Sequence, residues 1–256
     1  MIFGRKKKAA VPASPATADP VDEVEPEDDS TEEPDDTDGD VDGPGEEPDD
    51  STDDDSSAGE ESDDWDDYEA SRDWREDGPF DIDEVDLTGD EVDRLDLGSL
   101  IITPEEGMQL QIVADSQTGE GMALIAALES SALQIELRAA PSSGGFAKEL
   151  RGDIEAETTQ AGGSCELAKG PFGIELRRLL PATDQEGSEG VAPLRDWFAE
   201  GPRWLLIGRL MGEAALDVEG EGASLAMEEF FGNLVVRRGA EAMAAGQTVP
   251  LTIPQG

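Results

Sequence analysis

The sequence predicts an α+β domain in which two helices pack on a mostly antiparallel sheet, preceded by a long disordered acidic arm. Three observations support this expectation. Of the 63 acidic residues, 39 fall among the first 100 positions. Short alternating apolar runs separated by turn residues follow from about residue 97. Two stretches with the apolar spacing of a helix interrupt these runs.

Residues 1–96 are expected to form an arm without a core of its own. After the basic segment 5–8 (RKKK), residues 19–96 consist mainly of Asp, Glu, Ser, Thr, Pro and Gly. This composition buries too little apolar surface to offset the entropy of ordering the chain. Residues 97–256 have the composition and length of one domain, with a short extended C-terminal tail.

The first half of the domain reads as strands joined by tight turns. We expect strands at residues 100–102 and 108–113, then at 122–128 and 133–137, because their apolar and polar residues alternate or form short apolar runs. Turn residues separate each pair. The pattern indicates an antiparallel meander.

Two helices are expected in the second half. Phe146, Leu150 and Ile154 place an apolar stripe on one helix, and residues 223–234 carry the apolar spacing of a closing helix. Both are expected on one face of the sheet, and Val235 with Val236 as an edge strand or extended tail. Four strands are expected between the helices: 165–167, 174–180, 194–198 and 204–210.

The residue inventory excludes several classes of site. The chain has no histidine and one cysteine, Cys165, so histidine-based catalytic triads, histidine-ligated zinc and an intrachain disulfide are impossible. Phosphate-loop and dinucleotide-binding fingerprints are missing. The DGD at 38–40 lacks the spacing of a calcium loop. We therefore expect no catalytic residue, no cofactor and no specific metal site.

Arg203, Trp204 and Arg209 are candidate partner-binding residues of the domain. Arg203 and Trp204 place a cation beside a large aromatic ring at the start of a strand. Arginine and tryptophan are enriched at binding hot spots. The alternative is that Trp204 fills the core and Arg203 is a surface cation.

Trp65, Tyr68 and Trp74 form an aromatic island in the acidic arm and are the other candidates for partner binding. Charge steers an encounter with a basic surface, and an aromatic side chain anchors it. The alternative is that the island packs back on its own domain.

The compartment expected from the sequence is the cytoplasm. The basic start is followed by no apolar segment of a secretory signal, and no apolar run approaches the length of a membrane span. The acidic domain would repel phosphate, so it is not expected to bind nucleic acid directly. A protein partner is expected, and neither its identity nor the oligomeric state follows from the sequence.

The chain contains the segments GPFDIDEVD, RLDLGSLIIT, FAKELRGDI, GPFGIEL, GPRWLLIGRLMGEAA and LVVRRG. Together they resemble an uncharacterised actinobacterial family, the domain of unknown function 3710. The resemblance implies a cytoplasmic bacterial protein and supplies no activity and no site residues. The order of elements is also similar to the Mog1/PsbP-like α+β fold, which is an analogy of fold alone.

Three functions remain open. The first is a non-catalytic interaction or adaptor module. The second is an enzyme that binds an anionic small molecule in a pocket near Arg177, Arg203 and Arg209 and acts through Asp or Glu. The third is a regulator whose acidic arm mimics nucleic acid and competes for a basic surface.

Overall fold

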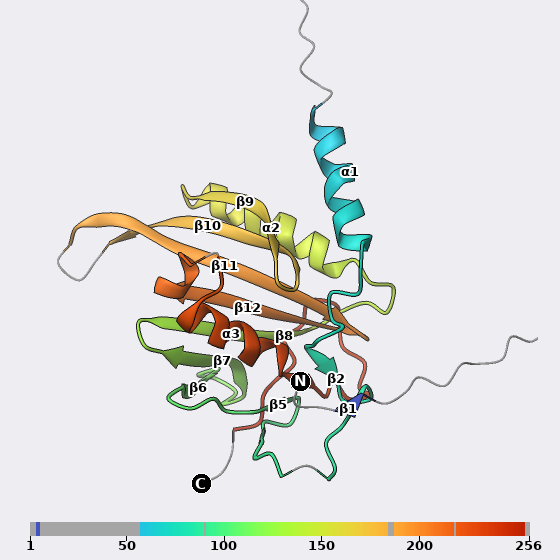
Figure 1. Cartoon of the computed structure of the whole chain (residues 1–256). Coiled ribbons are helices and arrows are strands. Elements are labelled where there is room, and N and C mark those ends of the chain that lie inside the picture. The colour runs from blue at the N-terminus through green and yellow to red at the C-terminus, as the bar shows by residue number, and fades with distance from the viewer. Residues whose placement is uncertain (1–3, 6–56, 90, 184–186, 218, 254–256) are drawn as a thin grey trace, which may run out of the picture. The chain divides into compact units, whose positions relative to one another are not determined.

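The computed structural model describes residues 4–5, 57–89, 91–183, 187–217 and 219–253 (Figure 1). The basic residues 6–8, the DGD at 38–40 and most of the expected arm lie outside this part. The described part contains α1 (Ser57–Ala70), α2 (Phe146–Gln160), the short 3-10 helix η1 (Glu213–Ala215) and α3 (Gly222–Gly232). None of its helices combines the length and apolar composition that crossing a membrane requires.

The largest sheet has seven strands, and every neighbouring pair is antiparallel. The predicted strands between residues 108 and 212 all belong to it, which confirms the mostly antiparallel α+β class. In spatial order the strands are β6 (Gln109–Ala114), β7 (Gly121–Leu128), β8 (Ser131–Ala139), β12 (Trp204–Gly212), β11 (Glu189–Gly201), β10 (Gly173–Thr183) and β9 (Ser164–Gly170).

A second sheet of four short strands corrects two expectations. Val235 and Val236 form an internal strand that pairs on both sides, not an edge strand or a tail. Two of the strands precede Leu97, so the folded domain begins well before the expected boundary. The order is β2 (Phe80–Asp81), β13 (Val235–Val236), β5 (Leu100–Ile102) and β4 (Leu95–Asp96), and β3 (Val85–Asp86) pairs separately with β1 (Gly4–Arg5).

The early boundary has a clear physical cause. Phe80 and Val85 are isolated among acidic residues in the sequence, yet they are 6% and 2% exposed and share a small core with Ile101 and Val235. Composition averaged over the acidic segment conceals two apolar side chains that distant strands bury.

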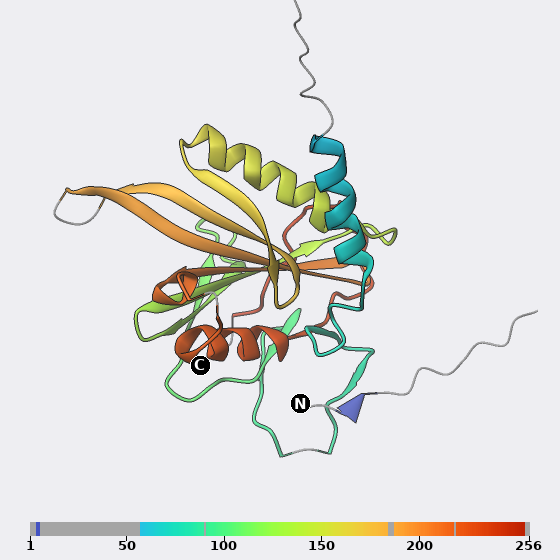
Figure 2. The same ribbon diagram turned by 45° about the horizontal axis from the view of Figure 1, so that its top comes forward.

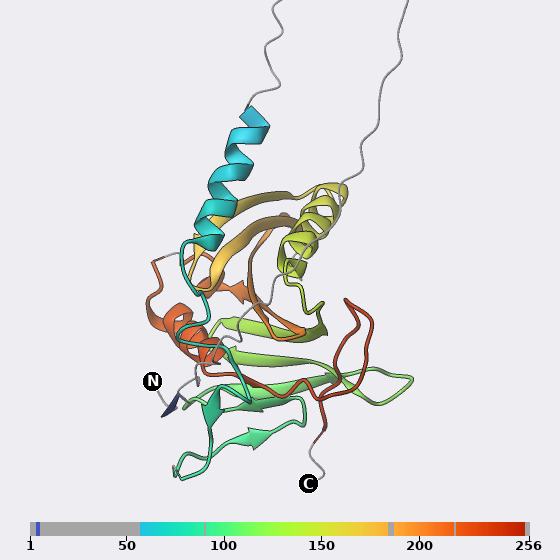
Figure 3. The same ribbon diagram turned by 90° about the vertical axis from the view of Figure 1, so that its right-hand side faces the viewer.

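The two predicted helices cover opposite faces of the seven-stranded sheet, not one face (Figure 3). Alternate residues of a strand point to opposite sides. On β12, Leu206 packs in the core cluster that contains α3, whereas Leu205 and Ile207 pack in the cluster that contains α2. Gly208 makes room on the α3 face, because a Cβ there would lie 2.7 Å from Cε2 of Phe231.

The C-terminal tail runs along the sheet and is held by backbone hydrogen bonds. The amide nitrogens of Gly246, Val249 and Leu251 each donate a 2.8 Å bond to a carbonyl of β8 or β7. Val249 and Leu251 are each 5% exposed. The tail therefore packs on the core and shields part of it from solvent.

Candidate functional site

Trp204 lies in the core and presents no surface to a partner. It is 0% exposed, and its Nε1 donates a 2.8 Å hydrogen bond to Oδ2 of Asp81. Arg203 occupies the turn between β11 and β12 with φ 63°, and its Nη2 donates to the carbonyl of Gly239 at 2.8 Å. The core interpretation of Trp204 therefore agrees with the structure, and the two side chains do not form a joint contact surface.

Arg209 belongs to a buried ion-pair cluster. Its Nε lies 2.8 Å from Oδ1 of Asp196, and Arg178 pairs with the other oxygen of that carboxylate at 2.7 Å. Asp196 is 0% exposed. This cluster lies on the α2 face of the sheet, where Arg178 also donates to Thr158 of α2.

The three arginines that suggested an anionic substrate pocket do not converge. Arg177 lies on the α3 face and pairs with Glu175, Arg209 lies on the α2 face, and Arg203 lies in a turn. The second function, an enzyme built on these arginines, loses the observation that motivated it.

The aromatic island packs back on its own domain. The rings of Trp65 and Tyr68 are 6.1 Å apart, and those of Tyr68 and Trp74 are 4.7 Å apart. Nζ of Lys169 lies 4.9 Å from the centre of the Tyr68 ring. Nε1 of Trp74 donates to the carbonyl of Glu69 at 3.0 Å, which ties the island to the end of α1.

Two ion pairs attach α1 to α2. Lys148 pairs with Asp66 at 2.7 Å, and both side chains are more than half exposed. Arg151 pairs with Glu69 at 2.8 Å, and the arginine side chain is only 6% exposed. The two lysines of residues 97–256, Lys148 and Lys169, therefore both contact this acidic segment.

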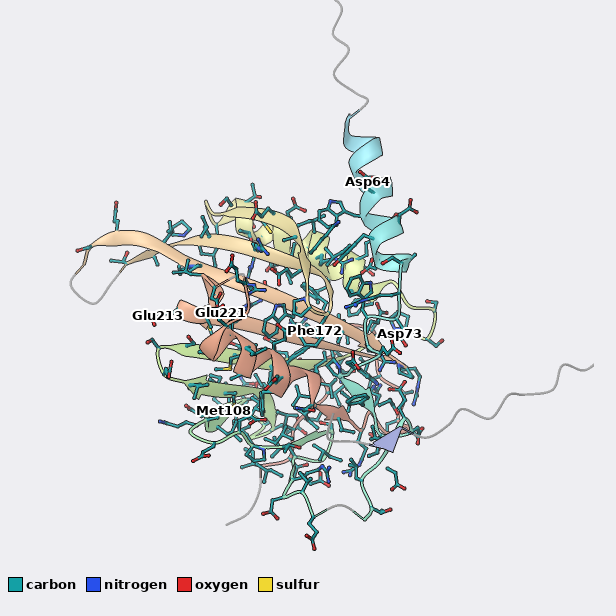
Figure 4. All side chains as sticks on the ribbon, in the orientation of Figure 1. Asp64, Asp73, Met108, Phe172, Glu213 and Glu221 are labelled. Carbon is teal, nitrogen blue, oxygen red and sulfur yellow. The ribbon has the colours of Figure 1, made fainter. Side chains whose placement is uncertain are left out.

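One concavity that these elements create is an acidic groove of about 580 Å³. Six carboxylates line it, against one arginine, and two aromatic side chains, Trp74 and Phe172, form part of its wall. Phe172 and Asp73 of this groove are labelled in Figure 4. The carboxylates are Asp73, Glu76, Asp77, Glu105, Glu228 and Glu229, and the arginine is Arg72.

Glu228 is the most perturbed carboxylate of the groove. Burial raises its pKa, and the neighbouring carboxylates of Glu175 and Glu229 raise it further, whereas Arg195 lowers it. It has no hydrogen-bond or ion-pair partner among the described residues. A half-buried carboxylate that forms no ion pair is stabilised in its charged form when a further cation reaches it.

The aromatic wall packs against the domain, and one of its rings already contacts a cation of the chain itself. Phe172 contacts Trp197 and Phe231 with ring centres 5.5 and 4.8 Å apart. The guanidinium of Arg72 lies 4.0 Å from the centre of the Trp74 ring at the rim of the groove. This stacking shows that the indole accepts a planar cation.

The sequence offered little signal for this groove. Its residues come from the connector after α1, the loop before β6, the β9–β10 turn and α3, and no single motif contains them. The apolar spacing that predicts a helix over residues 223–234 does not indicate that Glu228 and Glu229 line a groove. The aromatic residue inside the GPFG turn was the one local sign that this turn contacts something.

The comparisons with known proteins identify a family and no activity. The family model described as "Protein of unknown function (DUF3710)" matches residues 78–256. No curated protein matches the sequence. A solution structure of cyanobacterial PsbP (CyanoP) from Synechocystis sp. PCC 6803 is 12% identical, with a TM-score of 0.34, and the match covers 62% of this chain and 100% of that one. A TM-score this low supports no inference about this chain.

Proposed function

The chain belongs to the DUF3710 family, and we propose that it is a non-catalytic interaction domain whose acidic groove binds a basic peptide segment of a partner protein. We place this interaction in the cytoplasm. The observation that supports the proposal most directly is the combination of six carboxylates with two aromatic rings in one concavity of about 580 Å³.

The chemistry of the groove favours an extended cation over a metal ion. The described residues contain no group of three or more acidic, cysteine or histidine side chains placed to hold a metal. The carboxylates are instead spread along the groove, as a series of cationic side chains would require. A peptide with several basic residues matches that distribution.

Arginine matches the groove better than lysine. A guanidinium stacks on an aromatic ring and binds a carboxylate through two nitrogens at once, which an ammonium cannot do. Arg72 on Trp74 already shows the first of these contacts within the chain. We therefore expect the partner segment to carry arginine.

The test measures binding of a fluorescent hexa-arginine peptide to the full chain by anisotropy, with a hexa-lysine peptide beside it. The double variant Glu228→Gln/Glu229→Gln removes two carboxylates of the groove. Its matched control is Glu155→Gln/Glu157→Gln, which removes two exposed carboxylates of α2. The groove variant is expected to weaken hexa-arginine binding about tenfold, equivalent to about 1.4 kcal/mol.

The matched control separates the groove from the general acidity of the chain. Both double variants have the same net charge and the same N-terminal segment, so non-specific attraction is equal in the two. Equal affinities of the two variants for hexa-arginine would contradict the proposal. A preference for hexa-lysine would contradict the stacking contact.

A further inference from the structure

A second pocket, of about 330 Å³, lies between β10, β11 and η1, apart from the acidic groove. We call it the ribbon pocket. Its lining is mainly apolar and includes arginine side chains. The residues that matter for its chemistry are Arg177, Leu179, Pro193, Leu194, Ala215 and Leu216.

The pocket-lining residues Leu179 and Pro193 lie on paired strands β10 and β11. These strands continue as a ribbon that projects from the sheet (Figure 2). Pairing of β10 with β9 ends at Leu179, and pairing of β11 with β12 ends at Leu194. Beyond these points β10 and β11 pair only with each other, as far as Thr183 and Glu189. Leu179 and Val191 on this ribbon are exposed apolar side chains.

Two apolar side chains of the ribbon, and Leu216 directly after η1, are exposed. Leu179 is 44% exposed, Val191 63% and Leu216 67%. Each exposed apolar side chain that a ligand covers contributes about 25 cal/mol per Å² of buried surface. Pro181 and Pro193 lie on the two ribbon strands, and because proline lacks a backbone N–H, these edges are poor templates for an added strand.

Arg177 supplies the polar part of the pocket. Its Nε donates to Oε1 of Glu175 at 2.8 Å, and Arg195 pairs with the same carboxylate at 2.9 Å. Two guanidinium groups therefore share one carboxylate. The terminal nitrogens of Arg177 have no partner among the described residues, and its side chain is 31% exposed.

One carboxylate competes for Arg177. Glu166 faces it across the β9–β10 pair and also lines the pocket, but the two side chains form no ion pair in the described structure. Glu166 is exposed. Solvent therefore screens its charge, and an incoming anion can reach the free terminal nitrogens.

We propose that the ribbon pocket binds a small amphipathic anion. Its carboxylate accepts hydrogen bonds from the terminal nitrogens of Arg177, and its alkyl or aryl body lies against Leu179, Pro193 and Leu216. Pockets of about 300–1,000 Å³ with an apolar lining and few polar groups are typical small-molecule sites. The volume suits a ligand of medium-chain size.

Three ligands that share an eight-carbon chain and differ in their head group test which head-group charge the pocket prefers. Octanoate, octanol and octylamine are titrated into the full chain by calorimetry, with leucine-methyl NMR to locate binding at Leu179 and Leu216. Octanoate is expected to bind most tightly and octylamine least. Because the chain has a formal net charge of −45, non-specific electrostatics favour octylamine, the opposite order.

Variants connect the affinity to the named side chains. Arg177→Gln leaves Glu175 paired with Arg195 and is expected to weaken octanoate about tenfold, as is Leu216→Asp at the exposed rim. Glu166→Gln is expected to strengthen it. The control Arg237→Gln removes an exposed cation that pairs with Asp96 elsewhere and is expected to change the affinity less than twofold.

Three results would overturn the proposal. One is octylamine binding as tightly as octanoate. Another is equal loss of octanoate binding in Arg177→Gln and Arg237→Gln, since the effect would then follow net charge and not the pocket. The third is a set of NMR chemical-shift changes confined to methyl groups other than those of Leu179 and Leu216, which would show that octanoate binds elsewhere.

Discussion

Nε1 of Trp204 donates a hydrogen bond of 2.8 Å to Oδ2 of Asp81, and the two residues are 123 positions apart. Trp204 is 0% exposed and Asp81 is 7% exposed. The bond joins the central strand β12 to β2, which lies within the segment expected to be a disordered arm. It satisfies a buried indole donor that no residue after Leu97 satisfies in the described structure.

Replacing Asp81 is therefore expected to destabilise the domain. Asp81→Ala leaves the buried Nε1 of Trp204 without an acceptor, at a cost of about 1–3 kcal/mol. Urea unfolding followed by tryptophan fluorescence measures this loss. Asp83→Ala, at an exposed neighbouring position, serves as the control. A change below about 0.5 kcal/mol for both variants would show that β2 is not part of the cooperative unit.

Glu175 is expected to be the most sensitive carboxylate of the sheet. It is 1% exposed and accepts hydrogen bonds from Arg177, Arg195 and Trp197. Glu175→Gln leaves the buried guanidinium of Arg195 without its counter-charge, which costs about 3–5 kcal/mol. Thermal unfolding of this variant beside Glu166→Gln, which changes an exposed residue on β9, measures the difference. Similar melting temperatures for the two variants would argue against the network.

The two ion pairs between α1 and α2 are expected to differ in strength. Arg151→Gln removes a guanidinium that is 6% exposed, and Lys148→Gln removes an ammonium that is 60% exposed. Buried charge-assisted bonds are worth about 1.5–3 kcal/mol, exposed pairs about 0.2–1 kcal/mol. Hydrogen exchange of α1 amides should therefore rise at least about tenfold in Arg151→Gln and far less in Lys148→Gln.

Salt provides an independent check on this ranking. The exposed pair of Lys148 and Asp66 is screened at high ionic strength, whereas the pair of Arg151 and Glu69 is screened less. Exchange in the Lys148→Gln variant should therefore match the unmodified chain at about 0.5 M salt. The same salt concentration could also remove the difference in α1 hydrogen exchange between Arg151→Gln and the unmodified chain. In that case the burial of the Arg151 pair does not contribute to the docking of α1.

Glu228 is expected to make stability depend on pH. Its folded pKa lies above the ordinary value because of burial, so the folded state binds the proton more readily than the unfolded state. Stability is therefore greater below the unfolded pKa and falls as pH rises through the folded pKa. Glu228→Gln is expected to stabilise the domain at pH 7, and the gain should shrink toward zero in acid.

Urea unfolding of Glu228→Gln and of the unmodified chain at several pH values between 3 and 7 measures this dependence. Glu157→Gln, at an exposed position of α2, is the control and should show no such trend. A larger gain in acid than at neutral pH would contradict the predicted sign.

Local periodicity was sufficient to predict most elements of the domain. The alternation in β8 and the stripe of Phe146 and Ile154 in α2 appear where the sequence placed them. These patterns are readable because a strand or helix that buries one face must repeat its apolar residues with its own period. The absence of histidine and the presence of a single cysteine could likewise be read directly from the sequence.

Packing between distant segments settled the rest. Which face each helix covers, the internal place of β13 and the burial of Phe80 depend on partners far away in the chain. The acidic groove likewise requires four segments to meet around Phe172 and Glu228. Because periodicity reports only that a side chain is buried and never which residue buries it, these features were decided by the tertiary structure alone.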